Sequence, residues 1–69
     1  MITEKEEEYK KDPSHKLRLG IASWDSGTGV CKSVKFVNYD KSGKVSRTGE
    51  FPVEALEQAF NFAKREGYI

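Results

Sequence analysis

Alternation of apolar and polar residues predicts strands in the first two thirds of the chain. In residues 16–24, KLRLGIASW, the apolar residues Leu17, Leu19 and Ile21 occupy every second position, which is typical of a strand with one buried face. Residues 30–39, VCKSVKFVNY, are rich in β-branched and aromatic residues and predict a second strand. Residues 44–48, KVSRT, predict a short third strand.

Glycine-containing turns separate these strands. The segment DSGTG at 25–29 has two glycines suited to positive φ, and DKSG at 40–43 predicts a turn with Gly43 in the left-handed conformation. The predicted strands therefore follow one another as an antiparallel meander.

The spacing of apolar residues changes to a helical one in residues 52–66. Pro52 suits the first helical position, and Gly67 is a good C-terminal stop. An apolar stripe with i, i+3, i+7 spacing runs along the segment and consists of Val53, Leu56, Phe60 and Ala63, with Ala59 beside it. This stripe predicts that the helix covers one face of the sheet and leaves the other face open.

Residues 1–15 lack an apolar face. They are dominated by Glu and Lys, and Pro13 interrupts any helix, so the sequence predicts a mobile charged N-terminal arm. The predicted fold class is α+β: a three-stranded antiparallel meander with one C-terminal helix packed on one face, in the order β-β-β-α, forming a single domain over residues 16–69.

Composition adds three expectations. With 69 residues, of which 36% are hydrophobic, the chain has room for one domain with a thin core, and a homodimer is a natural way to bury more surface. The single cysteine, Cys31, excludes an intrachain disulfide and favours a cytoplasmic location. No apolar run is long enough to span a bilayer or to serve as a signal peptide, so no membrane contact is expected.

Charge is distributed unevenly along the chain. Residues 16–48 carry seven basic and two acidic groups, net +5, whereas residues 1–15 and 49–69 each carry net −2. A basic middle between two acidic ends indicates an anionic partner, although a solvated charged surface has the same pattern.

Two segments resemble chemical sites, but neither has all the residues that such a site requires. The segment GTGVCKS at 27–33 resembles a phosphate-binding loop, but Cys31 stands where that loop requires Gly, and a strand pattern follows where it requires a helix. His15 and Cys31 supply at most two metal ligands, and no third group orients them as a nucleophile and base. The sequence predicts no enzymatic activity, no metal and no cofactor.

One group of basic and aromatic residues is typical of a nucleic-acid-binding surface. If Leu17, Leu19 and Ile21 face the helix, strand alternation places basic and aromatic residues on the open face of the sheet, namely Arg18, Trp24, Lys35, Tyr39 and either Lys44 or Arg47. Bases of a single strand stack on exposed rings while cations follow the phosphates. Two alternatives remain: Trp24 in a core or dimer contact, and a protein-interaction module that uses the same residues as anchors.

The string from Ile21 to Phe60, IASWDSGTGVCKSVKFVNYDKSGKVSRTGEFPVEALEQAF, resembles the positive-cofactor-four type of transcriptional coactivator. The resemblance covers roughly residues 17–63, and the matching positions are Lys35, Tyr39, Gly43, Lys44, Arg47, Gly49, Glu54 and Leu56. It implies an antiparallel sheet with a C-terminal helix, a dimer, and binding of single-stranded DNA or melted duplex on the sheet. The same order of elements also resembles the three-stranded arm-binding domains of phage integrases and the plant ethylene-response-factor domain, which implies insertion of the sheet into the major groove of duplex DNA.

Overall fold

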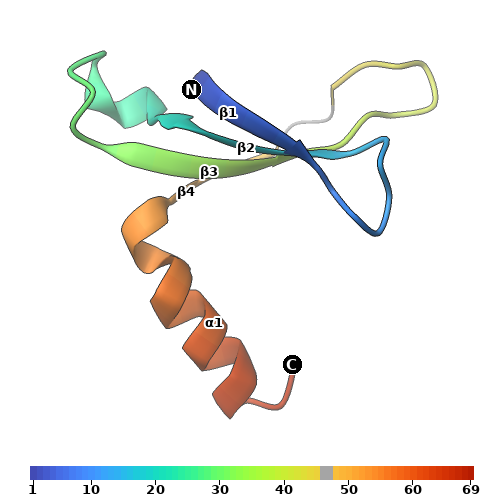
Figure 1. Cartoon of the computed structure of the whole chain (residues 1–69), viewed down its shortest axis with the longest axis vertical. Coiled ribbons are helices and arrows are strands. Elements are labelled where there is room, and N and C mark those ends of the chain that lie inside the picture. Colours follow the sequence, from blue (N-terminus) through green and yellow to red (C-terminus); the bar gives the residue numbers. More distant parts are fainter. Residues whose placement is uncertain (46–47) are drawn as a thin grey trace.

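A computed structural model describes residues 1–45 and 48–69 and shows a four-stranded antiparallel sheet followed by one helix (Figure 1). The strands lie in chain order, each beside its neighbour in sequence. They are β1 (Ile2–Glu8), β2 (Lys16–Ile21), β3 (Lys32–Val37) and β4 (Glu50–Pro52), and they are followed by a 3-10 turn, Val53–Ala55, and by α1 (Leu56–Arg65). The α+β class with a C-terminal helix is confirmed, whereas the prediction of three strands is wrong.

Strand β1 is the element that the sequence did not predict. Residues 2–8 form a seven-residue edge strand paired with β2, where an arm outside the sheet was expected. Ion pairs cross the β1–β2 ladder: Glu6 Oε2 lies 2.7 Å from Arg18 Nε, and Glu8 Oε1 lies 3.6 Å from Lys16 Nζ. Opposite charges on facing strands stabilise a pairing that has no apolar pattern of its own.

The last strand also differs from the prediction. It lies at Glu50–Pro52, not at 44–48, and it pairs with β3 so that Phe51 is opposite Val34. Of the predicted strand 44–48, Val45 makes only an isolated bridge to Tyr39, and residues 46–47 lie outside the described part. The preceding turn formed as predicted, with Gly43 at φ 82°.

The register of the sheet separates its two faces, because directly opposed residues of antiparallel strands point to the same side. One face, here called the apolar face, consists of Leu17, Leu19, Val34, Phe36 and Phe51. The other, here called the charged face, carries Glu6, Glu8, Lys16, Arg18, Lys35 and Glu50, together with the buried residues Gly20, Ser33 and Val37. The alternation read from the sequence is therefore confirmed for β2 and β3.

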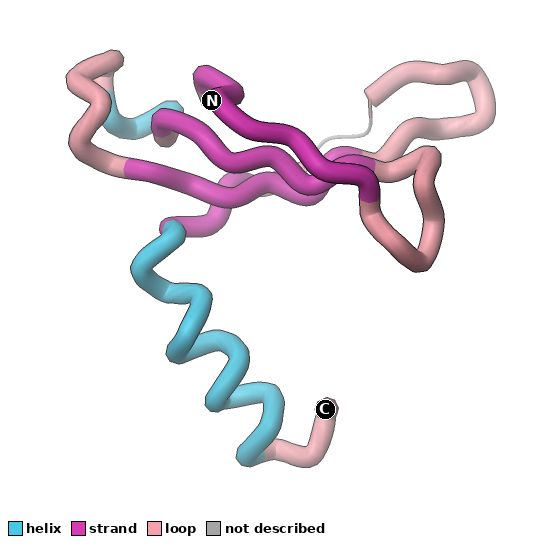
Figure 2. The backbone as a smooth tube through the Cα atoms, viewed as in Figure 1, coloured by secondary structure: helices cyan, strands magenta, loops and turns pink. Residues whose placement is uncertain are grey.

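Helix α1 does not lie flat on the apolar face. It leaves β4 through the 3-10 turn and extends away from the sheet, on the side toward which the β1–β2 turn also bends (Figures 1 and 2). Two rings of that turn, Tyr9 and His15, contact Phe36 edge to face, which places the apolar face on this side. The stripe residues Leu56 and Phe60 remain 43% and 55% exposed, so the predicted covering of the face by the helix is wrong for the single chain.

Few apolar residues are fully enclosed. Among the described residues, Ala22 and Val37 are the buried hydrophobic ones. No helix in the described part of the chain is long and apolar enough to cross a bilayer. The small core follows from the position of the helix, because the apolar stripe and the apolar face do not enclose each other.

Candidate nucleic-acid interface

Arg18 and Lys35 lie side by side at the centre of the charged face. They are directly opposed in the β2–β3 register, and side chains in such a pair stand about 5 Å apart at Cβ. The two like charges repel each other, and a neighbouring anion reduces this repulsion.

Strand β1 supplies such anions. Besides the pairs of Glu6 with Arg18 and Glu8 with Lys16, Glu4 Oε1 lies 2.8 Å from Lys32 Nζ. Three of the six cations in the described residues 16–45 are thus paired with carboxylates of residues 4–8. The net charge of +5 overstates how basic this surface is, because the sequence analysis placed the acidic residues in a separate arm.

Lys35 has no ion-pair partner among the described residues. Glu50 is opposite it in the β3–β4 register, but the Glu50 carboxylate is engaged elsewhere. It accepts hydrogen bonds from the Ser23 amide at 2.8 Å and the Ser33 hydroxyl at 3.1 Å, and it lies 2.9 Å from the Met1 amine. The Ser23 amide and the Met1 amine lower the pKa of Glu50 to about 2, so this carboxylate is charged at neutral pH.

Trp24 is not on a strand. Strand β2 ends at Ile21, and Trp24 lies half-exposed in a short 3-10 turn, Ser23–Asp25. The loop that carries it and the turn after β3 both rise on the side of the sheet opposite α1 (Figure 1). Trp24 therefore lies beyond the end of β2, in a loop on the side of the sheet away from α1, and the prediction that it lies on the strand is wrong.

The buried carboxylate of Asp25 shapes this loop. It accepts hydrogen bonds from the amides of Gly29 at 2.6 Å and Cys31 at 2.7 Å, and from the Thr28 hydroxyl at 2.8 Å. The Cys31 amide, with Thr28 and Gly29, lowers the pKa of Asp25 to about 2. Strand β3 begins at Lys32, so GTGVCKS leads into a strand, as predicted, and its amides bind a side chain of the protein.

The turn after β3 places the other predicted residues. Tyr39 is half-buried and bridged to Val45, and Lys44 is exposed with its amide bonded to Asp40 Oδ1 at 2.9 Å. Lys41, which the sequence analysis did not select, is exposed in the same turn. Arg47 lies outside the described residues. The structure thus brings Arg18 and Lys35 together and places Trp24, Tyr39 and Lys44 on segments at the rim.

Neither Cys31 nor His15 has the surroundings of a reactive group. A hydrogen bond to the Asp25 carboxylate raises the pKa of the Cys31 thiol, which is opposite to the shift that activates a nucleophile. His15 Nε2 lies 3.1 Å from Asp12 Oδ2, within its own turn. Within residues 1–45 and 48–69 no group of three or more His, Cys, Asp or Glu side chains is arranged to hold a metal ion.

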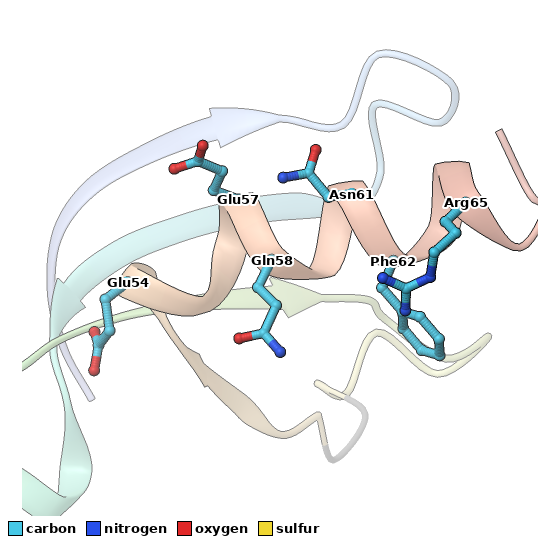
Figure 3. A pocket seen from close by; sticks show the side chains of 6 residues that line it. All are labelled: Glu54, Glu57, Gln58, Asn61, Phe62 and Arg65. Atoms are coloured by element: carbon cyan, nitrogen blue, oxygen red, sulfur yellow. The ribbon is translucent and has the colours of Figure 1, made fainter.

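The polar side of α1 forms a shallow hollow, whose lining residues are Glu54, Glu57, Gln58, Asn61, Phe62 and Arg65. Figure 3 shows these side chains spread along the helix and pointing in different directions, without a common centre. The Arg65 guanidinium lies over the Phe62 ring, 5.3 Å from its centroid. A row of solvated side chains explains this hollow better than a ligand site.

Comparisons with known proteins do not assign this chain to a family. No protein-family model, no curated protein and no solved structure matches the chain.

Proposed function

We propose that this chain is a non-enzymatic nucleic-acid-binding protein that contacts a single strand across the charged face. The observation that carries the proposal is the direct opposition of Arg18 and Lys35 in the sheet. Two loops lie on the side of the sheet away from α1: one contains the exposed Lys41 and Lys44, and the other contains the half-exposed Trp24. Cations in a row with an aromatic ring at the rim suit a phosphate backbone whose bases are free to stack.

A single strand fits this surface better than a duplex. Each base that stacks on an aromatic ring contributes about 1–3 kcal/mol, and a duplex hides its base faces. Trp24 is the one tryptophan of the chain, and its half-exposed ring is available for such stacking.

The carboxylates of β1 make the binding weak. A phosphate that approaches Arg18 competes with Glu6, whose Oε2 lies 2.7 Å from the guanidinium. Lys35 and the turn lysines offer contacts without such competition among the described residues. Removal of the Glu6 charge is therefore expected to increase affinity.

The experiment is a titration of the protein into a fluorescently labelled 20-nucleotide oligothymidylate at 50 and 200 mM salt. Each phosphate contact on a single strand contributes a slope of about 0.7 in log affinity against log salt, so three contacts predict a roughly 20-fold loss over this range. Quenching of Trp24 fluorescence in the same titration is expected if a base stacks on the ring.

Matched variants locate the contact. Lys35→Ala is expected to reduce the salt slope by about 0.7, whereas Lys11→Ala, which removes the same charge from the β1–β2 turn on the other side, leaves the slope nearly unchanged. Glu6→Gln is expected to raise affinity more than Glu57→Gln, which removes the same charge from the polar side of α1.

Other outcomes would replace the proposal. Tighter binding to duplex than to single strand would indicate a groove-inserting sheet. Absence of binding to either at 50 mM salt, where electrostatic attraction is strong, would leave a protein-interaction module. Equal effects of Lys35→Ala and Lys11→Ala would show that any binding observed is not centred on the charged face.

A further inference from the structure

We propose that a second copy of this chain covers the apolar face and the apolar stripe of α1, so that the helix of each copy lies in the angle between the helix and the sheet of the other. This inference concerns the side of the sheet opposite the charged face. It does not depend on the proposed nucleic-acid binding.

The single chain leaves two apolar surfaces uncovered on the same side. On the sheet, Leu19 is 44% exposed and Phe36 is 37% exposed. On α1, Leu56 and Phe60 are exposed to a similar degree. The exposure of Leu56 and Phe60 shows that the sheet of the same chain does not cover the stripe.

The dimensions of the chain show how much contact is missing. The radius of gyration is 13.4 Å, whereas a compact domain of this length has a value of about 11 Å. The accessible surface is 5521 Å², whereas a compact protein of 7.8 kDa exposes about 4,400 Å². Each chain therefore exposes about 1,100 Å² more than a compact protein of its size.

This excess of exposed area is as large as the area that each chain buries in a stable homodimer. Two copies that bury it against each other remove about 2,200 Å², which lies at the border between standard and obligate interfaces. A heterologous contact would leave the same surface open on one copy, whereas a two-fold contact uses the same surface twice and closes. An obligate dimer also explains why so few apolar residues are enclosed within one chain.

Charge does not oppose the pairing. The net charge of the chain is +1, so two copies repel each other only weakly. Next to Leu17 and Leu19, the hollow at the edge of the apolar face is lined by Lys5, Glu6 and Glu7, so groups of both signs are present there. Two such rims related by a two-fold axis can place Lys5 of one copy near Glu7 of the other.

Two measurements on the full chain test the proposal. Sedimentation equilibrium is expected to give twice the chain mass of 7.8 kDa. In an equimolar mixture of isotope-labelled and unlabelled chain, isotope-filtered nuclear Overhauser spectra are expected to show contacts between Phe60 of one copy and Leu19 or Phe36 of the other. A folded monomer at millimolar concentration, or intermolecular contacts confined to the charged face or the β1 edge, would overturn the proposal.

A matched pair of variants tests the stripe itself. Phe60 and Phe62 are both 55% exposed on the same helix, but they lie about 160° apart around its axis. Phe60→Asp is expected to raise the dimer Kd by about 30-fold or more, as for a central interface residue, whereas Phe62→Asp changes it less than about threefold. Equal effects of the two variants would contradict a contact through the stripe. If Phe60→Asp does not fold, the intermolecular contacts of the unaltered protein decide the question.

Discussion

The close approach of β1 to Gly20 provides a sharp test of the four-stranded sheet. A Cβ added at Gly20 would collide with the Ile2 carbonyl oxygen and would lie 3.0 Å from Thr3 Cα. Both atoms belong to the backbone of β1, and neither can rotate away as a side chain would. Gly20→Ala therefore requires the start of β1 to move by about 1 Å or more before the contact becomes acceptable.

The cost follows from the ladder that this shift breaks. The pairs Ile2↔Ile21 and Thr3↔Gly20 lie at the site of the clash. Loss of two backbone hydrogen bonds, each contributing about 0.5–1.5 kcal/mol net, gives about 1–3 kcal/mol. Replacing glycine with alanine also stabilises a protein by restricting its unfolded chain, and Gly49→Ala serves as the control for this effect. A Cβ at Gly49 meets nothing within 4 Å, and Gly49 does not adopt positive φ.

The assay is urea unfolding of both variants at the same protein concentration, followed by Trp24 fluorescence. With a slope of about 1 kcal/mol per molar urea, the midpoint of Gly20→Ala is expected to lie about 1–3 M below that of Gly49→Ala. Hydrogen exchange is expected to show lost protection at Thr3 and retained protection at Glu7. Equal midpoints, or unchanged protection at Thr3, would refute the described pairing of β1.

Two further predictions concern burial and pH. Val37→Ala is expected to destabilise the protein by about 2 kcal/mol, because Val37 is fully buried, while Val30→Ala, at a side chain that is 80% exposed, changes the unfolding free energy by less than about 0.5 kcal/mol. Equal effects in chemical denaturation would contradict the assigned core. The pKa values of Asp25 and Glu50 are lowered to about 2 from 3.8 and 4.5, so their contribution is complete above about pH 5 and is lost as the pH falls toward 2. The thermal midpoint is expected to be flat from pH 7 to 5 and to fall below pH 4.5, with a shallower fall in Asp25→Asn; an acid-stable midpoint would contradict the hydrogen bonds to both carboxylates.

Local sequence signals predicted the elements that local interactions specify. Alternation placed β2 and β3 within a few residues of their observed bounds, and Gly67, at φ 82°, ends the helix where it was expected. The error at Trp24 has a local cause that the pattern does not reveal. Asp25 draws the amides of Gly29 and Cys31 around its carboxylate, and the chain leaves the strand after Ile21 to form this loop.

Strand β1 depends on interactions that no local pattern contains. Its seven residues are all exposed, so the hydrophobic signal for a strand is missing. What pairs it with β2 is a match of Glu6 and Glu8 with Arg18 and Lys16, ten or so positions away in the chain. The signal present in the sequence was the alternation of Glu6 and Glu8 with the same spacing as Lys16 and Arg18. It pointed to both the fourth strand and the reduced positive charge of the candidate interface.

The position of α1 relative to the sheet could not be predicted from the sequence for a different reason. An apolar stripe shows that a helix must be covered, but it does not say by which surface. For a helix to fold back over a sheet, the connection between them must reverse the chain; here β4 has three residues and one 3-10 turn leads directly from Pro52 to Leu56. This connection directs α1 away from the sheet and leaves Leu56 and Phe60 beside solvent. The same stripe that predicted packing within one chain is therefore the strongest argument for packing between two, because the cost of exposing it is removed only when another apolar surface covers it.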